Sequence, residues 1–181
     1  YRTEFMFLDR EEPPTGDEHY KNYVDALNQF PDESIIVRTM DIGGDKPVPY
    51  LNLEESDNPF LGQRDIRLAF DDGQDLFDTQ IKALLRAAAS ENGENLAVMF
   101  PMITTVEEFE KALERVEELE AELDEEGKDY ERPELGLMIE TPSAVQMAGE
   151  LAHKADFLSI GTNDLTQYTM AASRTDSQVS D

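Results

Sequence analysis

Four short, nearly continuous apolar runs alternate along the chain with segments of helical periodicity. The runs cover residues 35–37, 96–100, 135–139 and 157–160. Uninterrupted apolar runs of this length are typical of strands that are buried on both faces, which is the pattern of a parallel sheet. We interpret residues 2–7 as the remnant of one more strand. The hydrophobic pattern therefore predicts a parallel sheet of roughly five strands.

Helical periodicity fills the intervals between these runs. From Val106 to Leu123, apolar residues recur at every third or fourth position, which indicates an amphipathic helix. Thr105 and Glu108 are spaced as a capping box before it, and Gly127 is placed to end it. Further helices are predicted around 20–27, 76–88 and 141–152. Because strand and helix alternate throughout, the predicted fold class is α/β.

Polar side chains follow the apolar runs at their C-terminal ends. Arg38 and Asp41 follow the first run, Glu140 follows the third, and Asn163 and Asp164 follow the fourth. In parallel sheets and barrels, active sites lie at this edge. A closed barrel has eight strands, so we predict a partial (β/α)8 TIM barrel, roughly its strands 2 to 6. Residues 1–181 would form a single incomplete domain, and a doubly wound open sheet is the alternative.

The charge of the chain narrows the class of partners. Asp and Glu number 41 against 15 Lys and Arg, which gives a net charge of −26. Nucleic acids and anionic membranes require cationic surfaces, so neither is expected as a partner. A surplus of acid this large also favours a halophilic source, because high salt screens the repulsion.

Two absences limit the chemistry and the location further. Cysteine is absent, which excludes disulfides, thiolate metal sites and a thiol nucleophile within this chain. The apolar runs are too short for a transmembrane helix, and no signal peptide is visible, so we expect a soluble, cytoplasmic protein.

Six cationic side chains lie in or beside predicted strand ends and loops. They are Arg2, Arg38, Lys46, Arg64, Arg67 and Arg174. Guanidinium groups form paired hydrogen bonds with carboxylate and phosphate oxygens, so their grouping indicates a pocket for a small, highly charged anion. Scattered surface ion pairs are the alternative.

Two carboxylates at neighbouring strand ends suggest a metal site. Glu140 and Asp164 end consecutive predicted strands, and two carboxylates with substrate oxygens and water is a common arrangement around Mg²⁺. In the alternative interpretation, each carboxylate caps the helix that follows it. His19 and His153 are expected on helix surfaces, without a role in the chemistry.

Six motifs in order resemble one known family. They are Arg2–Phe5, Val37–Lys46, Asn58–Arg67, Phe100–Met102, Ile139–Pro142, and Gly161–Tyr168 with Arg174. Together they resemble the phosphoenolpyruvate-binding domain of Enzyme I, which serves the bacterial-type sugar phosphotransferase system. The resemblance implies a (β/α)8 barrel, dependence on Mg²⁺, and a homodimer formed through this domain.

The resemblance also implies roles for individual residues. Arg2, Arg38 and Arg174 would bind the phosphate and carboxylate of phosphoenolpyruvate, beside the Asn163 amide and the Asp164 backbone. Lys46 and Arg64 would contact the phosphoryl group, with Arg67 as a further candidate, and Glu140 and Asp164 would hold Mg²⁺.

The implied reaction moves the phosphoryl group from phosphoenolpyruvate to a protein histidine and releases pyruvate. The histidine-containing phosphocarrier protein HPr would be the partner. The accepting histidine and the cysteine that donates a proton are expected outside this chain. Pyruvate phosphate dikinase, phosphoenolpyruvate synthase and a non-catalytic sensor that binds phosphoenolpyruvate are the alternatives.

Overall fold

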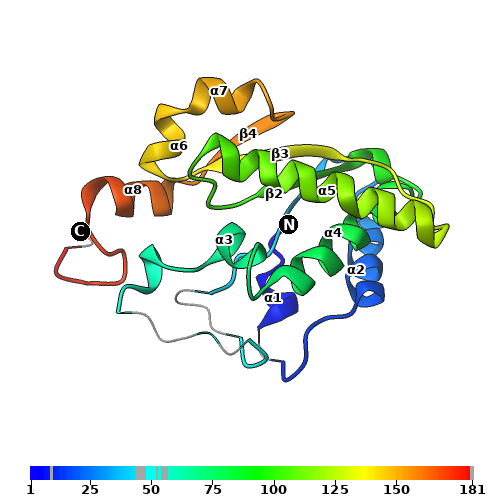
Figure 1. Ribbon diagram of the computed structural model, residues 1–181, viewed down its shortest axis with the longest axis horizontal. Helices are drawn as coiled ribbons and strands as arrows, with labels where there is room; N and C mark the ends of the chain where they lie inside the picture. Colours follow the sequence, from blue (N-terminus) through cyan, green and yellow to red (C-terminus); the bar gives the residue numbers. More distant parts are fainter. Residues whose placement is uncertain (9, 44–47, 52, 54–56, 180–181) are drawn as a thin grey trace.

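A four-stranded parallel sheet organises the protein (Figure 1). The computed structural model describes residues 1–8, 10–43, 48–51, 53 and 57–179. The strands are β1 (Ile35–Arg38), β2 (Leu96–Phe100), β3 (Glu134–Ile139) and β4 (Phe157–Ile160). All neighbours pair in parallel, in the order β1-β2-β3-β4. This confirms the predicted α/β class and places each strand within one residue of its predicted apolar run.

The strand order favours the barrel over the open-sheet alternative. Each strand pairs with the next one along the chain, as in a (β/α)8 barrel, whereas a doubly wound sheet reverses its order at a switch point. The protein therefore has the architecture of a partial barrel. The backbone of Arg2 adds a parallel bridge to Arg38 beside β1.

The prediction that residues 2–7 form a strand is wrong beyond Arg2. Residues 4–7 instead form α1 (Glu4–Phe7), a single helical turn. The side chains of Met6 and Phe7 are buried in this turn, so the apolar residues that suggested a strand reach the core by helical geometry.

Eight α-helices and two 3-10 helices are described around the sheet. After α1 come α2 (Gly16–Gln29), η1 (Pro59–Leu61), α3 (Asp65–Ala69), α4 (Gln74–Ala88), η2 (Gly93–Asn95), α5 (Val106–Glu126), α6 (Pro142–Gln146), α7 (Ala148–Ala152) and α8 (Thr162–Met170). In Figure 1, α5, α4 and α2 follow one another along one side of the sheet, and α6, α7 and α8 accompany the strands at its other end. None of the described helices combines the length and the apolarity that a membrane-spanning segment needs.

Local signals explain where these helices begin and end. The Thr105 hydroxyl accepts the Glu108 N–H at the start of α5, and Gly127 ends that helix with φ +65°. The predicted capping box is not reciprocal, because the Glu108 carboxylate accepts the N–H of Thr104 instead. The reciprocal box forms at Thr15 and Glu18, at the start of α2.

The long helix predicted over residues 141–152 is wrong as a single element. It is divided at Met147 into α6 and α7. Met147 lies outside both helices, with φ −99° and ψ 9°, and Gly149, a weak helix former, lies inside α7.

Aromatic packing joins the helices to the sheet. The rings of Phe77 on α4, Phe100 on β2 and Phe109 on α5 stand in a row, with centroids 6.2 Å and 6.1 Å apart. All three side chains are fully buried, and such aromatic pairs add to the stabilisation that comes from burial. The core therefore lies between the sheet and this helical layer, which leaves the strand ends to carry polar groups.

The surface position predicted for His19 is wrong, whereas His153 is exposed as expected. His19 lies inside α2 with its side chain fully buried, and its ring contacts those of Phe7 and Tyr23. It is in phase with Tyr23 and Leu27, the other buried residues of that helix.

Candidate functional site

The carboxyl ends of the parallel strands bring charged side chains together. Arg38 is the last residue of β1, Glu140 follows β3 directly, and Asp164 lies in the first turn of α8, which follows β4. Glu140 and Asp164 are buried, and Arg38 is nearly so. Charged groups are rarely buried unless they are paired or bind an ion. This cluster therefore marks the strand ends as the candidate site.

Arg38 is held between two carboxylates. Its Nη2 forms ion pairs with Glu4 Oε1 and Asp41 Oδ2. The Thr3 hydroxyl donates a hydrogen bond of 2.9 Å to the Arg38 carbonyl, which fastens the start of α1 to the end of β1. Glu4 carries no recognisable signal in the sequence, because its position depends on α1, where a strand is predicted.

Arg64 is the centre of the cluster. Its Nε donates to Asp65 Oδ2 at 2.6 Å, its Nη2 lies 3.5 Å from Asp41 Oδ1, and its Nη1 lies 3.7 Å from Asp164 Oδ1. Nη1 also donates to the Tyr168 hydroxyl at 3.3 Å. Only 3% of this arginine is exposed. A single guanidinium thus joins carboxylates from three segments of the chain.

The local backbone explains why Arg64 turns inward. Arg64 is extended before α3 and forms an antiparallel bridge with Gly43, and the Asp65 N–H donates to the Ile42 carbonyl at 3.0 Å. Gly43 has φ +87°, and a Cβ there would lie 3.0 Å from the Gln63 carbonyl oxygen. Both the conformation and the close approach require glycine at this position.

Asp65 contributes a fully buried carboxyl beside Arg64. Its φ is +50°, in the left-handed region that aspartate tolerates better than most residues. Burial and the neighbouring Asp41 raise the pKa of Asp65 well above its usual range, and Arg64 opposes this shift. Asp65 is not recognisable from the sequence as a site residue, because its burial depends on the bridge between Arg64 and Gly43.

Phe60 links Arg64 to Arg174. The two guanidinium carbons lie 5.8 Å and 5.9 Å from the centre of the Phe60 ring, within the range of a cation–π contact. Arg174 Nη1 donates to Asp164 Oδ2 at 3.3 Å, and the Tyr168 hydroxyl donates to the Phe60 carbonyl at 2.5 Å. The segment that follows β4 is thereby tied to η1.

Glu140 is a buried acid at the end of β3 with a strongly raised pKa. Its pKa is raised to about 7, chiefly by burial. The Met102 N–H, which donates to Oε1 at 2.7 Å, opposes this rise, Asp164 and Asp41 contribute to it, and Arg38 opposes it. A Cβ on Gly161 would lie 2.6 Å from Glu140 Oε2, so glycine leaves the space that this carboxylate occupies. Thr141, rather than Glu140, caps α6.

The two carboxylates Glu140 and Asp164 fit a hard divalent cation. Asp164 Oδ1 is buried and accepts no hydrogen bond from the described residues, and carboxylate oxygens are preferred ligands of Mg²⁺. The described part of the chain has no group of three or more acidic or histidine side chains arranged for a metal. The remaining ligands would therefore come from substrate and water, as is usual for Mg²⁺.

The other predicted site residues lie apart from the cluster or outside the described residues. Arg2 contributes its backbone beside Arg38 while its side chain is exposed, and Asn163 is exposed at the start of α8. Arg67 is not part of the cluster: its side chain is exposed and its Nε lies 3.4 Å from Glu108 Oε1. Lys46 lies outside the described residues.

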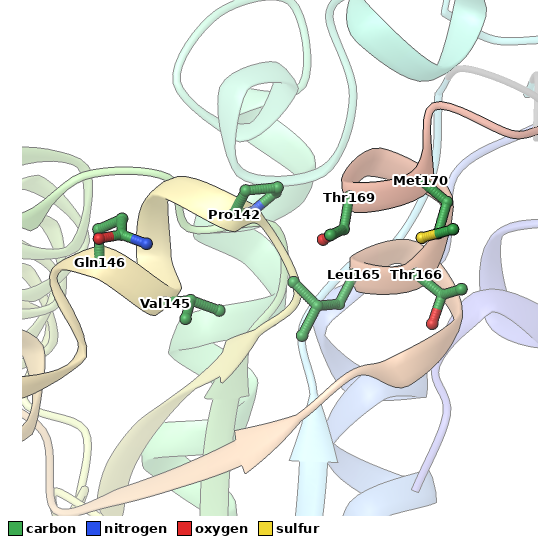
Figure 2. A pocket seen from close by; sticks show the side chains of 7 residues that line it. All are labelled: Pro142, Val145, Gln146, Leu165, Thr166, Thr169 and Met170. Carbon is green, nitrogen blue, oxygen red and sulfur yellow. The ribbon is translucent and has the colours of Figure 1, made fainter.

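A separate groove between α6 and α8 does not belong to this cluster (Figure 2). It has a volume of about 430 Å³. Its lining is mainly apolar: Pro142, Val145, Gln146, Leu165, Thr166, Thr169 and Met170. Figure 2 shows that α6 contributes one wall and α8 the other. No charged side chain lines it, so this groove does not suit a small, highly charged anion.

An arginine cluster and two carboxylates at the carboxyl ends of a partial α/β barrel form an arrangement whose chemistry suits a small anion beside a metal ion. Over residues 1–181 the chain matches the family described as PEP-utilising enzyme, PEP-binding domain. The chain belongs to this family of phosphoenolpyruvate-utilising enzymes.

Named relatives make the comparison more specific. The chain is 56% identical to the phosphoenolpyruvate-protein phosphotransferase of Haloferax volcanii, over 100% of this chain and 32% of that protein. It is 49% identical to the protein of the same name from Priestia megaterium and 47% identical to that from Bacillus subtilis, over 99% of this chain and 31% of each relative. The chain thus spans about a third of the length of the curated relatives that it matches.

Proposed function

We propose that the protein containing this chain transfers the phosphoryl group of phosphoenolpyruvate to a protein histidine and releases pyruvate, as the first step of the sugar phosphotransferase system. The single observation that carries this proposal is the buried Arg64, whose guanidinium faces Asp41, Asp65 and Asp164. Family membership and the shared name of the relatives support it.

The proposed binding residues match the two charged ends of the substrate. Arg38, Arg64 and Arg174 would bind its phosphate and carboxylate by exchanging part of their contacts with protein carboxylates for contacts with the ligand. Arg2, Lys46 and Asn163 complete the proposed set on the basis of their motifs. Guanidinium groups suit both ends, because each forms paired hydrogen bonds with two oxygens.

Glu140 and Asp164 are the proposed ligands of Mg²⁺. When bound, Mg²⁺ would neutralise charge on the phosphoryl oxygens. Beside it, the arginines would stabilise the charge that spreads over the equatorial oxygens, which leaves the protein mainly to position and neutralise the reacting group. Burial of the cluster strengthens these interactions, because water no longer screens them.

The overall step balances without a further reactant. The phosphorus–oxygen bond of phosphoenolpyruvate breaks as a phosphorus–nitrogen bond forms at the histidine, and the enolpyruvate that leaves gains a proton at carbon to become pyruvate. We propose that the accepting histidine and a proton-donating cysteine lie outside this chain. The phosphoryl group then passes to HPr. A cytoplasmic homodimer is proposed on the same resemblance.

The test uses the full-length protein. With phosphoenolpyruvate and Mg²⁺ alone, we expect at most one pyruvate per accepting histidine, and continuous release only after HPr is added. No release under either condition would contradict the proposal. A requirement for nucleotide would instead identify a dikinase or synthase, and binding without any turnover would identify a sensor.

A further inference from the structure

A buried chain of hydrogen bonds leads from α2 through α4 to the end of β1. The Met40 N–H donates to Gln80 Oε1 at 2.8 Å, and Gln80 Nε2 donates to the Tyr23 hydroxyl at 3.1 Å. Tyr23 Oη lies 2.9 Å from His19 Nδ1. All four residues are fully buried or nearly so. Gln80, Tyr23 and His19 lie outside the six family motifs, and the proposed chemistry does not use them.

The direction of each hydrogen bond follows from the first one. A backbone N–H can only donate, so the Gln80 carbonyl oxygen must face Met40 and its amide nitrogen must face Tyr23. The Tyr23 hydroxyl then accepts from Gln80 and has its own proton available for His19. The described residues offer this proton no other acceptor. His19 Nδ1 is therefore the acceptor, and the imidazole proton lies on Nε2, which has no hydrogen-bond partner among the described residues.

The chain of hydrogen bonds ends next to the charged cluster. Met40 lies between the end of β1 and Asp41, and Asp41 pairs with both Arg38 and Arg64. The Thr39 N–H still bonds across the sheet to Met99, whereas the next N–H, that of Met40, bonds to Gln80 instead. The backbone therefore leaves the sheet at Met40, and a side chain from α4 fixes where it goes.

We propose that Gln80 is a positioning residue of the anion site, which sets the place of Asp41, and through it of Arg38 and Arg64, by holding the Met40 N–H. Tyr23 and His19 keep the Gln80 amide in the one orientation that permits this. The role rests on the proposed function, because it concerns the arginines assigned to phosphoenolpyruvate. Gln80 does not touch the substrate in this account and acts only through the backbone.

Two variants of full-length protein separate positioning from stability. Gln80→Met keeps the approximate size of the side chain but leaves the Met40 N–H without its acceptor. Ile81→Val, at the next buried position of α4, disturbs the same helix and its packing while leaving the hydrogen bonds in place. For each variant we would measure kcat and KM for phosphoenolpyruvate and the hydrogen exchange rate of the Met40 amide.

We expect Gln80→Met to lower kcat/KM about 10-fold and to accelerate exchange at Met40 by at least as much, because a contact that shapes the site has been lost. Ile81→Val should change kcat/KM by less than about twofold. Unchanged kinetics in Gln80→Met, or an equal loss in both variants, would overturn the role.

A spectroscopic measurement separates this proposal from the proposed function. Nitrogen NMR of His19 in the full-length protein should show a neutral ring with its proton on Nε2. A proton on Nδ1 would refute the direction of the hydrogen bonds and hence the proposal, even in an active enzyme. A different outcome would refute the proposed function: a full-length protein with slow exchange at Met40 and a proton on His19 Nε2 that nevertheless releases no pyruvate. The hydrogen bonds would then be confirmed, but the role of Gln80 in the anion site would fall together with the function.

Discussion

Replacing Arg64 by lysine tests the centre of the site. Arg64 forms ion pairs with Asp65, Asp41 and Asp164 through three different nitrogens, whereas lysine has a single ammonium group. Arg64→Lys preserves the charge but must lose some of these contacts. A hydrogen bond to a charged group contributes roughly 1.5–3 kcal/mol, and 1.4 kcal/mol corresponds to about tenfold in rate. The variant should therefore lose about 10-fold to 100-fold in kcat/KM for phosphoenolpyruvate.

A matched control lies three residues away. The side chain of Arg67 is 46% exposed and pairs with Glu108 at the surface, where ion pairs contribute little. Arg67→Lys should therefore stay within about twofold of the wild type in pyruvate release by the full-length protein. Equal losses in the two variants, or full activity in Arg64→Lys, would refute the assignment of Arg64 as the central cation.

Three further predictions concern the core, the metal site and the surface. Burial lowers the pKa of His19 to about 4 in the folded protein, whereas in the unfolded chain the imidazole is protonated near pH 6.5. The free energy of unfolding should therefore fall by roughly 3 kcal/mol as the pH drops from 6.5 to 4. His19→Gln should reduce that fall in urea unfolding, and an identical pH dependence would contradict the assignment. Gly161→Ala should weaken Mg²⁺ binding in titration calorimetry, because the new Cβ would lie 2.6 Å from Glu140 Oε2. In the control Gly149→Ala the new Cβ has no atom within 4 Å, so this variant should bind Mg²⁺ normally. Equal affinities in the two variants would argue against Glu140 as a ligand. With a net charge of −26, the protein should resist unfolding better at 1 M than at 0.1 M salt, as the Debye length shortens from about 10 Å to about 3 Å, and equal midpoints would argue against a halophilic adaptation.

The positions of the strands follow from their apolar runs, although the expected burial on both faces holds throughout only for β2. Ile36 on β1 and Leu158 and Ile160 on β4 are exposed, because these are the two outer strands of the sheet. Continuous apolar runs such as 96–100 leave few alternatives to a buried parallel strand, and parallel pairing then places all C-terminal ends at one edge. The convergence of Arg38, Glu140 and Asp164 follows from that geometry. The specific roles of these residues towards Mg²⁺ and phosphoenolpyruvate do not follow from periodicity and are implied by the family motifs.

What was not predictable depends on contacts between distant segments. Arg64 and Arg67 look equivalent in sequence, but Arg64 precedes α3 in an extended conformation and is bridged to Gly43, while Arg67 lies within the helix. His19 has no neighbouring ligands in the sequence, which favours a plain position on the helix surface, yet it shares the phase of the buried Tyr23 and Leu27. Its burial is tolerated because Tyr23 satisfies one ring nitrogen, and Tyr23 is in turn held by Gln80, 57 residues away.

The most direct test of the central claim is a crystal structure of the full-length protein with phosphoenolpyruvate and Mn²⁺, which replaces Mg²⁺ and has an anomalous signal. The account predicts an anomalous peak about 2 Å from carboxylate oxygens of both Glu140 and Asp164. It also predicts phosphoenolpyruvate between that peak and the guanidinium groups of Arg38 and Arg64. A metal ion bound by neither carboxylate, or phosphoenolpyruvate in the groove between α6 and α8, would contradict it.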